Sequence, residues 1–223
     1  MITKITTAHK ATKGTAIATY FDDATAVAFK NGETIINSFD ESDGVHFIKQ
    51  GFVKACSSSQ DGHVNLLLIH KAGEFIPLPW ALDGNRTTSL SYVAVGDAMV
   101  AKSSKDKLRT AMSSNIMLTQ EILNQAVNVI AIYAQRIQTL EFRSARGRVI
   151  AELLFLAERF GRHAGSNIII TAPITHQDIA DSINMTRETA SRAIESLFVE
   201  ELLAQANHLF VILDSAKLRA ALS

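Results

Sequence analysis

The apolar positions between residues 25 and 102 fall in short runs that favour strands. Several runs alternate apolar and polar residues, and Gly, Asp or Ser separates one run from the next. Short, regularly spaced strands with such turns are typical of an antiparallel sandwich, barrel or roll. The runs are GETIINS, GVHFIKQ, GFVKACS, HVNLLLIH, LSYVAV and DAMVAKS.

The pattern changes between residues 116 and 140, where the chain contains neither Gly nor Pro. Apolar or aromatic residues fill seven of eight positions on a repeat of about 3.5 residues, the spacing of a coiled-coil seam. Ile122 and Val129 widen the stripe enough to contact a second surface. We predict a long helix that forms a dimer axis; the alternative is a core helix of one domain. The repeat comprises Ile116, Thr119, Leu123, Ala126, Ile130, Tyr133, Ile137 and Leu140.

Residues 143–223 predict helices followed by a small β element. An apolar helix face ends near Gly161, and a short strand, IIITA, follows it. The runs 203–205 and 209–213 are separated by three residues and suit a β-hairpin.

Two short helices flank a break at Ser182-Ile183-Asn184, where Asn184-Met185 makes the turn. Thr175 is placed to cap the first helix, with Asp178 in a variant of the capping box, and Thr186 is placed to cap the second. Helical spacing directs one set of apolar residues toward a core. These inward residues are Ile179, Ala180 and Ile183 in the first helix, and Ala190, Ala193, Ile194 and Leu197 in the second.

The outward face of the second helix is polar. Two helices joined by a tight turn form a helix-turn-helix, whose second helix fits the major groove of B-DNA. Arg187 and Arg192 are suited to guanine, and Glu188 to cytosine. The alternative is a solvated face with a Glu188–Arg192 pair, and the pattern alone leaves both open. Residues suited to phosphates are Thr175, Gln177, Thr186, Thr189 and Ser191.

Composition adds few constraints. The 223 residues suffice for two modest domains, and the formal net charge is zero. Residues 143–223 carry nine basic and nine acidic side chains, so we expect weak non-specific affinity for DNA. Cys56 is the only cysteine. No signal-peptide core and no membrane-spanning apolar run occurs, so we expect a cytoplasmic protein with no membrane partner.

The stretch ITHQDIADSINMTRETASRAIESL resembles the helix-turn-helix of the cyclic-AMP receptor protein/FNR (CRP/FNR) superfamily, and the resemblance extends over nearly the whole chain. It implies an α+β fold with three parts. Residues 1–108 would form a cyclic-nucleotide-binding-like β-roll, the sensor domain. Residues 109–142 would form a coiled-coil dimerisation helix and hinge, and residues 143–223 a winged helix-turn-helix.

The resemblance also implies a function. Its Arg-Glu-Thr-x-x-Arg core is present as residues 187–192. In receptor-type members these residues read a TGTGA half-site, so Arg187 and Arg192 would read guanines and Glu188 a cytosine. The chain would then be a homodimeric transcription regulator of an inverted repeat, with RNA polymerase as a further partner. We expect no cofactor, no metal site and no enzymatic activity.

The sensor departs from the family pattern. Pro77-Leu78 stands where nucleotide-binding members have Gly-Glu, although Arg86 and Thr87 still match the phosphate end. Tyr133-Ala134 aligns with the polar pair that contacts adenine. We predict an altered pocket that includes Arg86, Thr87, Leu78 and Tyr133, and we expect that cyclic AMP is not the effector.

Several alternatives remain open at this point. Glu74 or Asp83 could replace the missing carboxylate, and Arg86 could pair with one of them. The sensor could instead be vestigial, with an unknown effector or none. The winged helix could also bind a protein partner.

Overall fold

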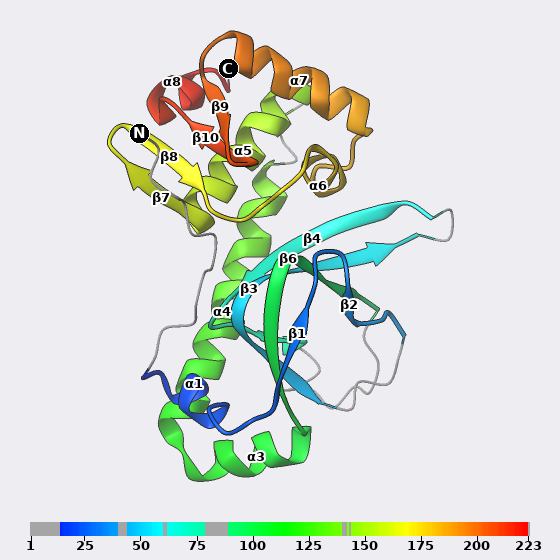
Figure 1. Ribbon diagram of the computed structural model, residues 1–223, viewed down its shortest axis with the longest axis vertical. Coiled ribbons are helices and arrows are strands. Elements are labelled where there is room, and N and C mark those ends of the chain that lie inside the picture. Colours follow the sequence, from blue (N-terminus) through cyan, green and yellow to red (C-terminus); the bar gives the residue numbers. More distant parts are fainter. Residues whose placement is uncertain are drawn as a thin grey trace. The chain divides into compact units, whose positions relative to one another are not determined.

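The computed structural model describes residues 14–39, 44–59, 62–78, 89–139, 142 and 144–222 (Figure 1). Leu140, Arg86 and Thr87, which the sequence analysis singled out, lie outside these residues. The chain divides into two compact units inside one helix, between Ala134 and Gln135, and residues 64–66 group with the C-terminal unit. The α+β fold expected from the sequence is confirmed.

The N-terminal unit is an antiparallel roll. Its elements are α1 (Ala16–Tyr20), β1 (Ala26–Phe29), β2 (Thr34–Ile36), β3 (Val45–Ser58), β4 (Val64–Lys71), β5 (Phe75–Ile76), β6 (Ser91–Ser103), α3 (Lys105–Ser114) and the first part of α4 (Ile116–Thr139). In the described part of the chain, six strands form a sheet with the order β1-β6-β3-β4, to which β2 and β5 add at β6 and β3. The long β3–β6 pair runs from Val45↔Ser103 to Cys56↔Ser91.

One face of α4 closes the core of the roll. Leu118 and Ile122 are each 1% exposed and join a cluster that contains Phe47 and Phe21. The rings of Phe21 and Phe47 are stacked with their centroids 5.1 Å apart. Ala126 and Val129 pack against the same cluster. This packing explains why the apolar stripe of α4 is wider than a coiled-coil seam requires.

The C-terminal unit is a winged helix. After the end of α4 come α5 (Ala145–Phe160), β7 (Gly161–Ala164), β8 (Asn167–Ile170), α6 (His176–Ser182), α7 (Arg187–Val199), β9 (Leu203–Ala206), β10 (Leu209–Ile212) and α8 (Ser215–Ala220). The strands form an antiparallel sheet in the order β7-β8-β10-β9. Helix α5 packs against α6, α7, α8 and β8.

The predicted elements of this unit are present, and two elements are additional. The β9–β10 hairpin and the strand at IIITA were predicted, whereas β7 and α8 were not. Helix α5 ends at Phe160, next to Gly161 as expected, and the structure gives a reason for the glycine. A Cβ there would lie 2.1 Å from the Ala157 carbonyl oxygen, to which the Gly161 N–H donates.

Candidate nucleic-acid interface and sensor region

The first helix of the helix-turn-helix, α6, begins with the predicted capping box. The Thr175 hydroxyl accepts from the Asp178 N–H at 3.1 Å, and the Asp178 carboxylate accepts from the Thr175 N–H at 2.9 Å. The Asp178 side chain is buried. Two backbone donors that the helix itself cannot satisfy are thereby bonded, which fixes the start of α6.

The turn between the two helices depends on Asn184. Its φ of 52° lies in the left-handed region, which Asn adopts more readily than most residues. The Met185 N–H donates to the Ala180 carbonyl at 3.0 Å and closes the turn. Thr186 then caps α7, because its hydroxyl accepts from the Thr189 N–H at 3.3 Å. The turn and the second cap were both predicted.

Helix α7 has one buried face and one exposed polar face. The four residues predicted to face inward, Ala190, Ala193, Ile194 and Leu197, are all buried.

Arg187, Glu188 and Arg192 are exposed on the opposite side. Among the residues that the structure describes, neither arginine forms an ion pair. Arg192 Nε donates to the backbone carbonyl of Glu188 at 3.4 Å, and within the described part of the chain it forms no ion pair with the Glu188 carboxylate. Both guanidinium groups can therefore donate to an external acceptor.

The residues suited to phosphates lie near the starts of α6 and α7, and their polar atoms already have local partners. The hydroxyls of Thr175 and Thr186 accept cap bonds, and the Thr186 and Thr189 hydroxyls lie 2.9 Å apart. The Gln177 amide donates to Asp181 at 2.6 Å. A hydroxyl or amide with one local bond still has donor or acceptor capacity, so these contacts leave phosphate binding open.

His176 is a residue of this surface that the sequence analysis missed. Its Nδ1 lies 3.1 Å from the Ser191 hydroxyl, and its ring stacks on Phe210 with a centroid distance of 5.7 Å. Burial lowers the pKa of His176, nearby Glu195 raises it, and Arg187 lowers it, with a net decrease from the ordinary value. His176 therefore joins α6, α7 and β10 as a neutral side chain at pH 7. Its only sequence signal is its place directly after the Thr175 cap.

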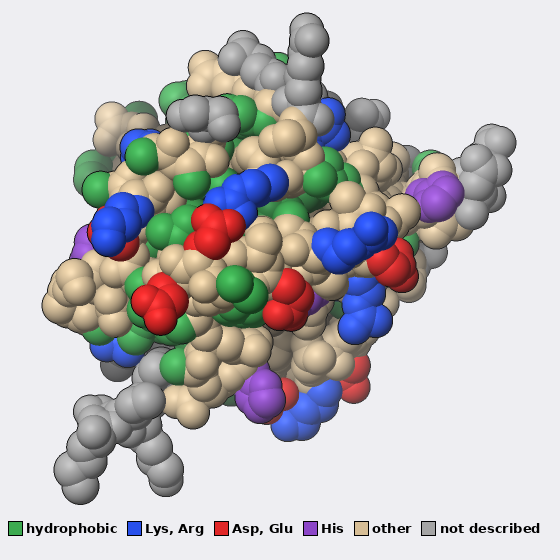
Figure 2. Space-filling model, turned by 90° about the horizontal axis from the view of Figure 1, so that it is seen from above, with side chains coloured by type: hydrophobic (Ala, Val, Ile, Leu, Met, Phe, Trp, Pro, Cys, Tyr) green, Lys and Arg blue, Asp and Glu red, His purple; other side chains and the backbone are tan. Residues whose placement is uncertain are grey.

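The face drawn in Figure 2 carries basic and acidic side chains side by side, with no extended basic area. Two arginines near the start of α5 are engaged internally. Arg146 forms a bidentate pair with Glu200, both contacts being 2.7 Å, and Arg148 donates to the Phe142 carbonyl. On this face, therefore, the neutral composition corresponds to interspersed basic and acidic side chains.

The exposed face of α4 differs in part from the predicted dimer seam. Leu123, Ile130 and Ile137 are exposed, as a seam in a single chain should be. Ala126 instead packs against the roll core, and Tyr133 is half-buried. Val127 and Ala134 are exposed in their place. We call Leu123, Val127, Ile130, Ala134 and Ile137 the α4 stripe.

Of the four residues of the predicted pocket, the structure describes Leu78 and Tyr133. Leu78 is buried in the same core cluster as Phe75. The Glu74 carboxylate lies 2.9 Å from His70 Nδ1. Gln125 of α4, a residue not predicted to matter here, accepts from the Phe75 N–H at 3.3 Å and donates to the Gly73 carbonyl at 2.8 Å. The turn before the altered cassette is therefore bonded directly to α4.

The described residues contain no group of three or more His, Cys, Asp or Glu side chains arranged to hold a metal ion. None of their helices combines the length and apolar character needed to cross a bilayer.

Each half of the chain matches a known domain family. Residues 26–115 match the cyclic nucleotide-binding domain, and residues 147–221 match the Crp-like helix-turn-helix domain. The CRP-like cAMP-activated global transcriptional regulator of Mycobacterium tuberculosis is 27% identical over 180 residues, which make up 80% of each protein.

Two solved structures share the fold. FixK2 from Bradyrhizobium japonicum has a TM-score of 0.74 at 19% identity, over 88% of this chain and 96% of its own. A CooA mutant from Carboxydothermus hydrogenoformans has a TM-score of 0.77 at 16% identity, over 96% and 98%. The two domain matches, over residues 26–115 and 147–221, together with the curated relatives, show that the chain belongs to the CRP/FNR superfamily: it is a transcription regulator with a helix-turn-helix DNA-binding domain, and not an enzyme.

Proposed function

We propose that the protein binds, as a homodimer in the cytoplasm, an inverted repeat of TGTGA-like half-sites. Arg187 and Arg192 donate to guanine O6 and N7, and Glu188 accepts from cytosine N4. The observation that carries this proposal is the exposure of two arginines, without ion pairs among the described residues, on a helix whose start is fixed by a cap. The polar character of this face favours DNA over a protein partner.

Phosphate contacts would position α7 in the groove. The hydroxyl and amide groups of the five predicted residues, together with His176, lie around the starts of α6 and α7, where helix N–H groups also favour anions. Because the DNA-binding half is formally neutral, few phosphates are neutralised by fixed charge. We therefore assign most of the affinity to base readout and to the simultaneous binding of two half-sites by the dimer.

The dimer forms through the α4 stripe. Its large apolar side chains are exposed in the single chain, while the opposite face of the helix is already buried in the roll. Exposed apolar side chains at coiled-coil spacing need a partner helix. A second copy of α4 supplies one and places two recognition helices about a two-fold axis. RNA polymerase is the further partner we propose for this regulator.

Single-arginine variants test the base readout. Arg187→Ala and Arg192→Ala should each weaken operator binding by about 1–3 kcal/mol and relax the preference at one guanine. Fluorescence anisotropy with the consensus operator and single-base variants measures both effects. Arg219→Ala, which removes an exposed positive charge from α8, is the matched control. Equal losses of affinity in all three variants, with unchanged base preference, would contradict the assignment.

We also propose that the sensor is altered and that cyclic AMP is not its effector. A buried Leu78 cannot accept a hydrogen bond from a ribose hydroxyl, and Glu74 is already bonded to His70. The relative from Mycobacterium tuberculosis is named as cAMP-activated, so this proposal separates the chain from that relative. The second candidate is a vestigial sensor, which the packing of Leu78 into the core favours.

Titration calorimetry with cyclic AMP and cyclic GMP tests the sensor proposal. We expect no binding in the micromolar range and no change in operator affinity with either nucleotide. Micromolar binding of one of them, coupled to tighter operator binding, would show an intact nucleotide site. Operator binding that needs no added effector would support the vestigial sensor.

A further inference from the structure

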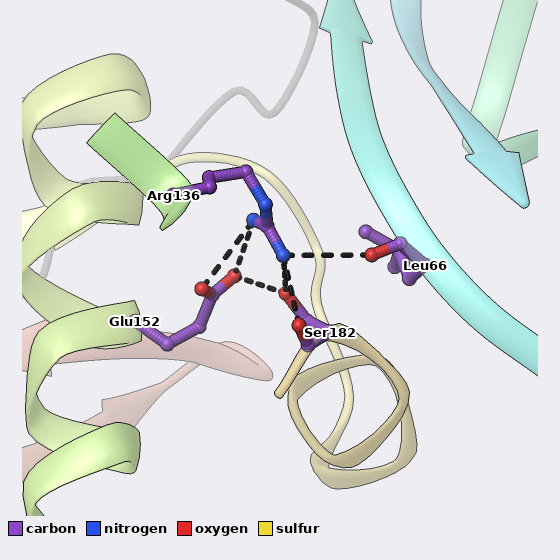
Figure 3. Close-up of polar contacts among 4 residues, drawn as sticks. All are labelled: Leu66, Arg136, Glu152 and Ser182. Carbon is purple, nitrogen blue, oxygen red and sulfur yellow. Dashed lines mark hydrogen bonds and ion pairs between the residues drawn. The ribbon is translucent and has the colours of Figure 1, made fainter. Parts of the chain in front are cut away.

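A buried polar cluster joins the end of α4 to the helix-turn-helix (Figure 3). Arg136 Nη1 contacts the two carboxylate oxygens of Glu152 in α5 at 3.3 and 3.4 Å. Arg136 Nη2 donates to the carbonyl and the hydroxyl of Ser182 in α6, at 2.8 and 2.7 Å. The Ser182 hydroxyl in turn donates to the Glu152 carboxylate. We call these three residues the Arg136 cluster.

The cluster is shielded from water. The side chain of Glu152 is 2% exposed and that of Arg136 is 13% exposed. The guanidinium carbon of Arg136 also lies 5.3 Å from the centre of the Phe155 ring, and its Nη2 is 3.5 Å from the Leu66 carbonyl. Since a buried carboxylate is costly without a partner, Glu152 needs Arg136 in this place.

Arg136 binds next to the turn that leads into the recognition helix. Ser182 is the last residue of α6, and its carbonyl is among those that the helix leaves without an internal partner. A positive charge at a helix C-terminus is favourable. The planar guanidinium donates to α5 and α6 at the same time, in a fixed geometry that a lysine ammonium cannot reproduce.

Stability alone is a weak reason for such a cluster. Replacing both partners of a buried ion pair with apolar residues of similar size is often neutral or stabilising, whereas removing one partner is strongly destabilising. Directional bonds specify orientation, which apolar contacts do less well. The cluster is therefore suited to fixing the angles that the last turn of α4 makes with α5 and α6.

We propose that Arg136 is a positioning residue for operator recognition: through Glu152 and Ser182, it fixes the helix-turn-helix on the last turn of α4. In a dimer joined along α4, this orientation sets the separation of the two recognition helices, and hence the half-site spacing that the protein accepts. The inference rests on the proposed function, because it requires a dimer that binds two half-sites.

The test uses the full chain with the paired substitution Arg136→Met and Glu152→Leu, which leaves no unpaired buried charge. Affinity is measured for a single half-site and for inverted repeats whose spacing changes by one base pair at a time. We expect unchanged thermal stability and half-site affinity, and loss of about tenfold or more in affinity at the best spacing, with a flatter spacing preference. Arg136→Lys, which keeps the charge but not the planar fork, should shift the profile in the same direction.

The matched control removes an ion pair that does not involve α4. Arg146→Gln with Glu200→Gln breaks the contact between α5 and the end of α7, and it should leave the spacing profile as in the wild type. A wild-type profile in both Arg136 variants would overturn the inference, as would a paired variant that loses half-site affinity as much as operator affinity. A wild-type protein without any spacing preference would refute the proposed function and this inference with it.

Discussion

Substitution of Ile130 by glutamate is the sharpest test of the proposed dimer axis. Ile130 is 68% exposed in the single chain, so the change should leave the folded protomer intact. Complete burial of an isoleucine contributes about 1.5–3 kcal/mol, and two-thirds of that is about 1–2 kcal/mol per copy. Two copies meet in a dimer. The lost burial alone therefore weakens the dimer by about 2–4 kcal/mol, or roughly 30-fold to 1,000-fold in the dissociation constant.

The introduced charges increase this effect. Each glutamate would be desolvated at the interface and would face its symmetry mate, and both effects oppose association. Sedimentation equilibrium over a range of protein concentrations measures the dissociation constant directly. Operator affinity, measured on the same samples, should fall in parallel, because a monomer can occupy only one half-site.

Asn128→Glu is the control for the charge itself. Asn128 is exposed on the same helix but lies outside the α4 stripe, so its substitution should leave the dimer unchanged. Equal dissociation constants for the Ile130→Glu and Asn128→Glu variants would refute the proposed axis. Loss of the wild-type far-UV circular dichroism spectrum in Ile130→Glu would show instead that Ile130 supports the protomer fold, contrary to its exposure, whereas a lower melting temperature alone is expected from loss of the dimer.

Three further outcomes follow from the helix-turn-helix. The pKa of folded His176 is lowered from 6.5, so the unfolded chain takes up the proton first as the pH falls. Stability from this residue is therefore complete above about pH 6.5 and is lost as the pH falls through the folded pKa. Urea unfolding measured from about pH 8 to pH 5 should show that the free energy of unfolding falls less at acidic pH in His176→Gln than in the wild type. An unchanged pH dependence would refute this. Asn184→Gly should keep stability, whereas Asn184→Val should cost about 1–2 kcal/mol because of the positive φ, and equal melting temperatures would contradict the turn geometry. Thr175→Ala should cost about 1 kcal/mol through loss of the cap, and thermal unfolding without a change would show that the cap adds nothing.

The helix-turn-helix could be predicted from the sequence because its signals are local. The caps at Thr175 and Thr186 lie within three residues of the N–H groups that they satisfy. The apolar residues of α7 follow helical spacing and are all buried. Strand β7 offers no such signal, because all four of its residues are exposed and its pairing with β8 is the only reason that it is a strand.

The remaining features depend on tertiary contacts. Helix α4 has apolar residues on two faces, and only the packing of Leu118 and Ile122 on the roll shows which face stays exposed. Because Ala126 packs on the roll and Tyr133 is half-buried, Val127 and Ala134 take their places in the exposed stripe. The Arg136 cluster joins residues separated by 16 and 46 positions in the chain, and no periodic pattern connects them. A buried Glu152 therefore could not be distinguished from a surface glutamate by sequence alone.

Selection of DNA from random and genomic fragments, followed by sequencing, tests sequence-specific recognition most directly. The full-length protein should enrich an inverted repeat of TGTGA-like half-sites with centres about one helical turn apart. The double variant Arg187→Ala/Arg192→Ala should lose this enrichment while still folding, since both side chains are exposed. Fragments without a shared inverted repeat, or the same repeat enriched by the double variant, would contradict base readout by α7.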